Sequence, residues 1–248
     1  MSGGRVLTVD VVLTADRVVA DRLAGATALV IDVLRASTTM ITALGHGAAC
    51  ILPVADLDEA RRRAADLGHG ALLAGERGGD PPPGFDLGNS PLEFTRERVA
   101  GRTIVMTTSN GTRALAAARG AAAVGVAAFV NASAATAWVQ GHGGDIVLIC
   151  SGELGQPALE DTVCAGLLAE RLARDLPDAV LTPAAQEVRT LAAGYAKDLS
   201  RLGQDAPHAR SLERKGRGQD LAVCLALDAS AVVPRRLPGV DKLVWRPR

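Results

Sequence analysis

The sequence predicts an α/β fold with three layers, in which helices cover both faces of a mostly parallel or mixed sheet. Strand and helix patterns alternate along the first two-thirds of the chain, and the last third is rich in helical patterns. Hydrophobic residues make up 48% of the sequence but aromatic residues only 2%, so the core must consist of Ala, Val, Leu and Ile. Such cores suit sheets that are covered on both faces. The 248 residues fit a single domain, 1–248, with at most a subdivision near residues 155–160.

The expected elements of the first 150 residues follow one another as βαβ units. The 56–67 helix is the clearest, because Asp56 can cap its first turn and Glu59 stands at the capping-box position. The Gly and Pro content of residues 76–91 predicts a loop. The predicted strands are 6–13, 28–33, 51–54, 71–74, 103–107, 122–126 and 145–150. One helix is predicted to end near residue 44, and three more are predicted at 56–67, 112–118 and 132–140.

The last third of the chain, from about 160 to 227, predicts a series of helices. Breaks between them are expected near Pro183, Gly203 and Gly216, where a helical pattern cannot continue easily. Short strands are expected after these helices, at 232–233 and 243–244.

Charge and cysteine content exclude several classes of protein. Basic and acidic residues number 27 each, and the few aromatic side chains offer no stacking platform, so we expect no nucleic-acid partner. No apolar run reaches the ~20 residues of a membrane span, and the N-terminus enters a strand pattern without a signal peptide. The four cysteines form no CxxC motif and are interpreted as reduced thiols. These features predict a cytoplasmic protein without a membrane partner.

A Gly-His-Gly repeat occurs three times, around His46, His69 and His142. Each copy ends a helical pattern and precedes a strand, where glycine can satisfy the last carbonyls of the helix. In open α/β sheets, ligands bind at the carboxyl edge, which is opposite such turns. We therefore expect structural rather than functional roles for these three histidines.

Polar side chains follow three of the predicted strands, in the segments 32–39, 108–113 and 151–153. Turns of this kind present backbone N–H groups at helix N-termini, which bind phosphate well. The same hydroxyl and amide side chains also cap helices for structural reasons, so a single turn is weak evidence. Three such turns in one sheet indicate an anion site, with candidate binding residues Ser37, Thr38, Thr108, Asn110, Gly111, Thr112, Arg113 and Ser151.

The long loop 76–91 adds further polar candidates, since a loop of this length in a compact domain is usually functional. Glu76 and Arg77 come directly after their strand, and Asp86, Asn89 and Ser90 can face a polar ligand. An ordered surface loop with Asx turns is the structural alternative for the loop.

Three carboxylates are candidate ligands of a hard cation. Asp161 begins a helix and is expected beside Ser151, where it could join Asp32 and Glu76 around Mg²⁺. An acidic residue in a first helical turn is also favoured by the helix dipole alone, which is the structural alternative for Asp161.

Several familiar catalytic motifs are absent from the sequence: Walker A, GxGxxG after a strand, HExxH and GxSxG. Asp32 follows a strand as the nucleophile does in haloacid dehalogenase phosphatases. Their second aspartate, two residues further on, is replaced here by Leu34, which weakens that interpretation.

Taken together, these motifs resemble the 2-phosphosulfolactate phosphatase family. The resemblance rests on the segments 32–38, 75–77, 84–91, 107–112, 151–152, 160–161 and 164–166, with a less specific match around His208, Ser211 and Asp220. It implies an α/β fold distinct from haloacid dehalogenases and a Mg²⁺-dependent hydrolase that converts 2-phosphosulfolactate to sulfolactate and phosphate. In that family the step belongs to coenzyme M synthesis, and the resemblance also makes a homodimer plausible.

Such a substrate carries at least three anionic groups, and Arg35, Arg77 and Arg113 stand in the strongest motifs. The predicted catalytic residues are Asp32, Arg35, Glu76 and Asp161. In this hypothesis Asp32, Glu76 and Asp161 position Mg²⁺, and Arg35 and the 110–112 helix start bind the phosphate. Either water activated by the metal or Asp32 itself attacks phosphorus.

His208 is the fourth histidine and could protonate the leaving alkoxide or contact the acid groups of the substrate, although a structural role is the stronger expectation. Two other functions stay open from the sequence: a phosphatase or phosphotransferase for a different small phosphorylated hydroxy acid, and a non-catalytic anion-binding protein.

Overall fold

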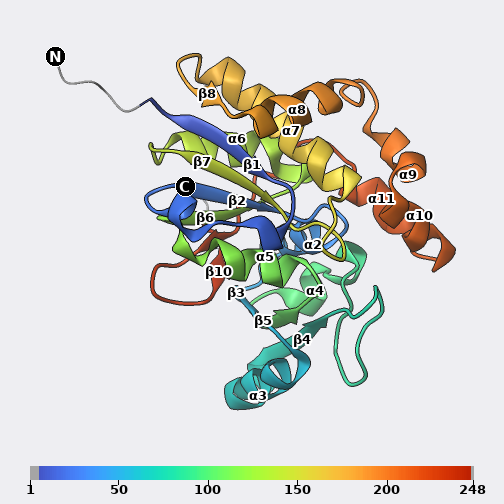
Figure 1. Ribbon diagram of the computed structural model, residues 1–248. Coiled ribbons are helices and arrows are strands. Elements are labelled where there is room, and N and C mark those ends of the chain that lie inside the picture. The colour runs from blue at the N-terminus through green and yellow to red at the C-terminus, as the bar shows by residue number, and fades with distance from the viewer. Residues whose placement is uncertain (1–5, 247–248) are drawn as a thin grey trace.

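The computed structural model describes residues 6–246, which form an α/β fold with a mixed sheet (Figure 1). Within these residues ten strands form one sheet. In their order across the sheet the strands are β4 (Ala71–Gly75), β5 (Thr103–Thr107), β3 (Cys50–Pro53), β10 (Leu243–Val244), β9 (Arg235–Arg236), β6 (Ala123–Ala127), β2 (Thr27–Ile31), β7 (Ile146–Cys150), β1 (Thr8–Val12) and β8 (Val180–Leu181).

The sheet consists of two parallel groups that are joined by the C-terminal hairpin. In the first group β5 lies between β4 and β3, and in the second β6, β2, β7, β1 and β8 are neighbours. Strand β10 pairs antiparallel with β3 and β9, and β9 pairs antiparallel with β6. The expected mixed sheet is therefore confirmed, and residues from the end of the chain complete its centre.

Helices lie on both faces of the sheet, as expected. Along β2, Leu29 and Ile31 belong to one hydrophobic cluster while Ala28 and Val30 belong to another, because successive side chains of a strand point to opposite faces. The helices are α1 (Ala20–Leu23), α2 (Ala36–Gly45), α3 (Leu57–Leu67), α4 (Arg96–Val99), α5 (Gly111–Ala117), α6 (Ala132–Gln140), α7 (Leu159–Asp175), α8 (Pro183–Ala193), α9 (Leu202–Asp205), α10 (Pro207–Arg214) and α11 (Gln219–Cys224).

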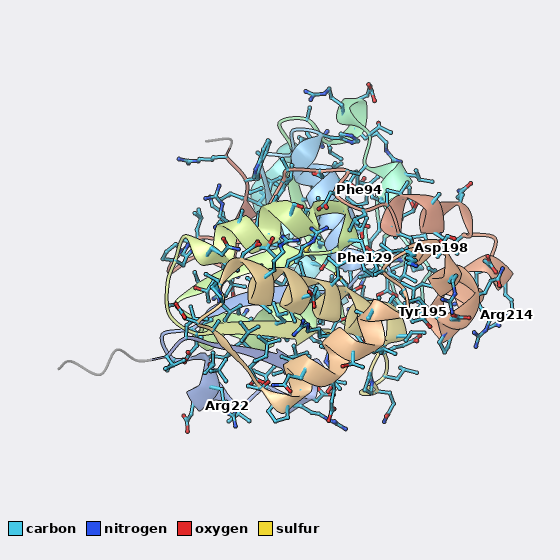
Figure 2. All side chains as sticks on the ribbon, turned by 90° about the horizontal axis from the view of Figure 1, so that it is seen from above. Arg22, Phe94, Phe129, Tyr195, Asp198 and Arg214 are labelled. Atoms are coloured by element: carbon cyan, nitrogen blue, oxygen red, sulfur yellow. The ribbon has the colours of Figure 1, made fainter. Side chains whose placement is uncertain are left out.

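The two faces carry different helices. Helices α6, α7 and α8 pack with the Leu29 cluster, and α2 and α5 pack with the Ala28 cluster. Helices α7 and α8 pack closely, since a Cβ atom on Gly166 would lie 2.1 Å from the Val188 carbonyl oxygen. Figure 2 shows the long α7 and α8 side by side, with the shorter C-terminal helices beyond them. Helices α9, α10 and α11 extend this layer toward the turn after β2 (Figure 1).

Most of the predicted elements are confirmed within one or two residues. Asp56 caps α3 by accepting a hydrogen bond from the Glu59 N–H at 2.8 Å, as predicted. Glu59 reaches back only to the Ala55 N–H, at 3.3 Å, so the capping box is not closed as expected.

Most of the errors of the sequence prediction lie in the C-terminal third. The strand expected at 232–233 lies instead at β9, because ladder pairing begins where Arg235 meets Gly125, after Pro234. Gly203 lies inside α9 rather than at a break. The breaks at Pro183 and Gly216 are confirmed, and β10 occupies 243–244 as predicted. Elements α1, α4 and β8 were not expected, and each of them is at most four residues long.

The three Gly-His-Gly copies lie between a helix and the next strand, as predicted. His46 follows α2 and donates from Nδ1 to the Phe94 carbonyl at 2.6 Å, and His142 follows α6 and donates to the Trp138 carbonyl at 2.9 Å. His69 lies in a short 3-10 turn before β4. The four cysteines are free and buried. Among residues 6–246, no helix has both the length and the apolar character needed to cross a membrane.

Candidate active site

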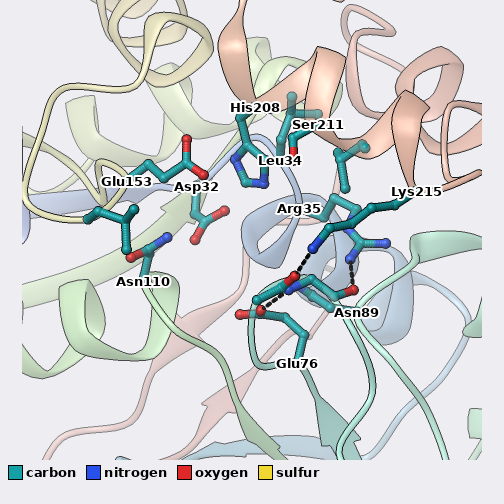
Figure 3. Close-up of a pocket in the computed structure, with 14 residues that line it drawn as sticks. Asp32, Leu34, Arg35, Glu76, Asn89, Asn110, Glu153, His208, Ser211 and Lys215 are labelled. Atoms are coloured by element: carbon teal, nitrogen blue, oxygen red, sulfur yellow. Dashed lines mark hydrogen bonds between the residues drawn. The ribbon is translucent and has the colours of Figure 1, made fainter.

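A polar cavity of about 220 Å³ lies where the turns after β2, β4, β5 and β7 meet α10 (Figure 3). Each of these turns follows the carboxyl end of a strand, which is where α/β folds usually bind ligands. The cavity is lined by Asp32, Leu34, Arg35, Glu76, Gly78, Gly79, Asn89, Asn110, Glu153, Leu154, His208, Ser211, Leu212 and Lys215.

Asp32 stands immediately after β2 and is held by the turn that follows. Its Oδ1 accepts the Ala36 N–H at 3.1 Å, and Ser37 Oγ accepts the Asp32 N–H at 2.9 Å. Among the hydrogen bonds of the described residues 6–246, the Asp32 carboxylate accepts through Oδ1, and none is made to Oδ2. Burial raises the pKa of Asp32 to about 6, although the Ala36 N–H and the charge of His208 lower it in part. One carboxylate oxygen of Asp32 is therefore left for a ligand.

Glu76 also lines the cavity, but both of its carboxylate oxygens are engaged. Oε1 accepts the Ser109 N–H at 2.6 Å, and Oε2 accepts the Gly79 N–H at 2.7 Å. These bonds connect the turn after β4 to the turn after β5, on which Asn110 is presented to the cavity. Glu76 thus organises the two loops that form one wall of the cavity.

Asp161, in the first turn of α7, lies behind the cavity wall rather than in it. Its Oδ1 accepts the Val33 N–H at 2.8 Å, and its Oδ2 accepts the Ser151 hydroxyl at 2.9 Å. Burial and the neighbouring charges of Asp32 and Glu160 raise the pKa of Asp161 well above its ordinary value. Asp161 therefore ties the turns after β2 and β7 to α7.

The three predicted metal carboxylates do not form a cluster of ligands. Within the described residues 6–246, no group of three or more His, Cys, Asp or Glu side chains is arranged to hold a metal ion. Of the three, only Asp32 has a carboxylate oxygen that the described protein leaves open. The role of Glu76 and Asp161 as metal ligands stays a prediction.

Of the three predicted arginines, the structure brings only Arg35 to the cavity. The Arg35 side chain is 2% exposed, and its Nη1 lies 2.7 Å from Asp220 Oδ2. Arg77 is turned back, with its guanidinium donating to the Glu76 carbonyl and to Thr107 Oγ1. Arg113 is 56% exposed and pairs with Asp16 on the surface.

Two further basic residues line the cavity, namely His208 in α10 and Lys215 directly after it. His208 Nδ1 lies 3.4 Å from Glu160 Oε1. Burial by itself would lower the pKa of His208, but the bond to Glu160 and the charges of Glu153 and Asp32 raise it to about 9. Lys215 donates from Nζ to the Gly78 carbonyl and so reaches from the end of α10 to the loop after β4 (Figure 3).

Many of the predicted binding residues do not line the cavity and instead bond to other parts of the chain. Among the described contacts, Ser37 accepts from the Asp32 N–H, Asp86 accepts from the Leu73 N–H and Ser90 donates to Asp220. The predicted residues that line the cavity are Asp32, Arg35, Glu76, Asn89, Asn110 and His208, and those that do not are Ser37, Thr38, Arg77, Asp86, Ser90, Thr108, Gly111, Thr112, Arg113, Ser151 and Asp161.

Glu153 and Lys215 line the cavity but were not among the predicted site residues. Glu153 stands in the segment 151–153 that the sequence had already marked as a polar turn, so its signal was available. Lys215 follows α10 in the helix-rich third, where nothing in the local pattern indicates which helix end reaches the site.

The cavity combines both signs of charge. Asp32, Glu76 and Glu153 are acidic, and Arg35, His208 and Lys215 are basic. Guanidinium and ammonium groups recognise oxyanions, whereas an unpaired carboxylate near an anion is useful when a cation bridges the two. The fold and the cavity together define an α/β protein with an enzyme-like site for a small anionic ligand.

Comparison with known proteins identifies the family. A family model described as 2-phosphosulpholactate phosphatase matches residues 12–237. The chain therefore belongs to the 2-phosphosulfolactate phosphatase family, as its motifs had indicated.

Several relatives are similar over most of their length, and each is named probable 2-phosphosulfolactate phosphatase. The protein of Symbiobacterium thermophilum is 40% identical over 216 residues, which are 87% of this chain and 93% of that protein. The protein of Thermotoga petrophila is 37% identical over 215 residues, or 86% and 90% of the two chains. That of Clostridium acetobutylicum is 30% identical and covers 94% and 99%.

Proposed function

We propose that this protein is a Mg²⁺-dependent phosphatase that hydrolyses 2-phosphosulfolactate to sulfolactate and phosphate. The observation that carries the proposal is the cavity, in which the open oxygen of Asp32 faces a set of basic side chains in a chain of this family. A place in coenzyme M synthesis and a cytoplasmic location are parts of the same proposal. The location is supported by four free, buried cysteines, and the pathway by the family alone.

The oxygen donors of the cavity fit Mg²⁺. Asp32 offers Oδ2, and Asn89 Oδ1 is buried without a hydrogen-bond partner among the described residues. Glu153 supplies a further carboxylate (Figure 3). Mg²⁺ prefers carboxylate and amide oxygens, and it commonly takes only one or two protein carboxylates besides water and phosphate oxygens. A bound Mg²⁺ would neutralise phosphate charge and make a bound water more acidic.

The basic side chains bind and orient the substrate in this proposal. Arg35 presents a planar guanidinium to the phosphate, and the ammonium group of Lys215, which also lines the cavity, suits the carboxylate or sulfonate. Asn110 can donate to a substrate oxygen from the turn after β5. Lining groups of opposite charge keep each end of the substrate in one orientation, which places phosphorus next to Asp32.

His208 is the proton donor in the proposed reaction. Figure 3 shows its ring beside Asp32 and Glu153 in the upper part of the cavity. With a pKa of about 9 it carries a proton at neutral pH, which it can give to the alkoxide oxygen as the P–O bond breaks. The attacking oxygen comes from water or, in the alternative route, from Asp32 itself, in which case a phosphorylated Asp32 is then hydrolysed.

Phosphate release from a panel of substrates tests the proposal. We expect release from 2-phosphosulfolactate that depends on Mg²⁺, and about 100-fold lower kcat/KM for phospholactate, which lacks the sulfonate. Equal rates for both would indicate another phosphorylated hydroxy acid. Binding of the substrate without release at any Mg²⁺ concentration would reject a phosphatase and indicate an anion-binding protein. Trapping of labelled phosphate on the protein separates the Asp32 route from direct attack by water.

A further inference from the structure

A buried ion pair holds the principal arginine of the cavity. The side chains of Arg35 and Asp220 are 2% and 1% exposed, and their Nη1 and Oδ2 atoms lie 2.7 Å apart. Asp220 is in the first turn of α11, far from Arg35 in the sequence, and it does not line the cavity itself. Two charges removed from water in this way require excellent geometry to be tolerated.

The pair belongs to a network that fixes its orientation. Asp220 Oδ1 accepts a hydrogen bond from Ser90 Oγ at 2.5 Å, so both carboxylate oxygens of Asp220 are engaged. On the other side, Arg35 Nη2 donates to the Gly79 carbonyl at 3.0 Å. The guanidinium is thereby held by α11 and by the 76–91 loop at the same time, so a rotation of its plane would break at least one of these two bonds.

We propose that Asp220 is a positioning residue, which fixes the guanidinium of Arg35 as the phosphate-binding group of the cavity. The inference rests on the proposed function, since it assigns a role within the same site. A guanidinium has five N–H donors in a rigid plane. Two of its nitrogens are already bonded to Asp220 and Gly79, so the direction of the remaining donors is decided before a ligand arrives. Such pre-organisation lowers the cost of binding and of reaching the transition state.

A purely structural role for the pair makes different predictions. In that case Asp220 would only attach α11 to the turn after β2, and its loss would weaken the fold without changing the turnover of molecules that remain folded. A positioning role instead lowers kcat and weakens phosphate binding in protein that is fully folded. The two roles are separated by activity per folded molecule.

The experiment compares Asp220→Asn with a matched control, Asp228→Asn. Asp228 also pairs with an arginine at 2.7 Å, Arg171, on a part of the molecule that does not line the cavity. We expect Asp220→Asn to lower kcat about 100-fold, as a small misplacement of a catalytic group does, with a smaller change in KM. We expect Asp228→Asn to keep kcat within about twofold. Thermal unfolding and circular dichroism establish that both variants are folded.

A double-mutant cycle with Arg35→Met completes the test. If Asp220 acts through Arg35, adding Asp220→Asn to Arg35→Met causes no further loss of kcat. Independent losses that multiply would overturn the proposal, as would a folded Asp220→Asn protein with normal kcat. If Asp220→Asn does not fold, Ser90→Ala replaces it, because it removes only the hydrogen bond to Asp220 Oδ1. We then expect about a tenfold loss of kcat, and a normal kcat overturns the proposal.

Binding of inorganic phosphate separates this inference from the proposed function. Calorimetry with the wild-type protein, Asp220→Asn and Asp228→Asn does not depend on turnover. Weaker phosphate binding in Asp220→Asn alone supports the positioning role even if the wild-type protein releases no phosphate from any substrate. Equal binding in all three proteins contradicts the positioning role, whether or not the wild-type protein is a phosphatase.

Discussion

Gly111 lies directly against the open carboxylate oxygen of Asp32. A Cβ atom on Gly111 would be 2.8 Å from Asp32 Oδ2 and 2.6 Å from the Ala36 Cβ. Both distances are too short for atoms that are not bonded, so the turns after β2 and β5 approach this closely only because residue 111 has no side chain. This contact sets how closely the turn that carries Asp32 approaches the turn that carries Asn110, whose side chains are neighbours in the cavity (Figure 3).

Replacement of Gly111 by alanine is the first test of that contact. We expect Gly111→Ala to displace Asp32, to lower kcat/KM by about 10- to 100-fold and to cost about 1–3 kcal/mol of unfolding free energy. Steady-state kinetics and urea unfolding measure the two effects. Gly120→Ala is the matched control, because its Cβ would meet nothing closer than 3.6 Å. Normal kinetics in Gly111→Ala would show that Asp32 does not need its present position.

Replacement of Asp32 by asparagine should lower activity but raise stability. Because burial raises its pKa to about 6, the charged form is destabilised in the folded protein at neutral pH. Asp32→Asn keeps an acceptor for the Ala36 N–H and removes that charge, so we expect roughly 1–3 kcal/mol of added stability without metal. We expect turnover to fall by about 1,000-fold or more. Both are measured at pH 7.5, and a variant that is active, or less stable than wild type, contradicts the assignment.

Replacement of Asp161 by asparagine tests whether this residue supports the turns or binds the metal. In Asp161→Asn one oxygen can still accept the Val33 N–H, but the amide nitrogen cannot accept from Ser151 or Gly152. We expect a loss of about 1–3 kcal/mol of unfolding free energy, with Mg²⁺ activation changed less than about tenfold. A Mg²⁺ titration of activity gives the answer. A loss of Mg²⁺ dependence would instead establish Asp161 as a ligand, as the sequence predicted.

The stability contributed by His208 should depend on pH. Its pKa is raised from 6.5 in the unfolded chain to about 9 in the folded protein, so the folded protein holds the proton more tightly. This stabilisation is fully present below pH 6.5 and is lost as pH rises through about 9. We expect the stability difference between wild type and His208→Gln to shrink by on the order of 2–3 kcal/mol between pH 6 and pH 9.5. Urea unfolding across this range measures the difference, and a constant value would show that His208 is not held protonated.

Apart from the short helices α1 and α4, the secondary structure of the first 150 residues could be predicted, because each of the longer elements carries its own local signal. The α3 cap at Asp56 and the strand β5 are local features, and both are where the sequence placed them. The strand β9 could not be placed in this way. Its position depends on where the chain meets Gly125 of β6, while the more hydrophobic Val232 and Val233 pack against the core without joining the ladder.

In the candidate site, too, residues with a local sequence signal could be predicted and residues placed by tertiary packing could not. Turn residues at strand ends were recognisable, and Asp32, Asn89 and Asn110 do line the cavity. Lys215 could not be recognised, because its place depends on how α10 packs against the rest of the chain. The three arginines were equivalent in sequence, but only Arg35 is paired with a buried carboxylate, that of Asp220, and only Arg35 lines the cavity.

The sequence by itself determined the α/β class, the polar turns after the strands and the family, because hydrophobic periodicity and contiguous motifs are properties of neighbouring residues. Only the tertiary structure decided the orientation of each charged side chain. Asp161 points to backbone N–H groups of two turns, whereas Asp32 keeps one oxygen open to the cavity. The physical reason is that a buried carboxylate turns toward the donors that packing brings within reach, and those donors come from distant parts of the chain.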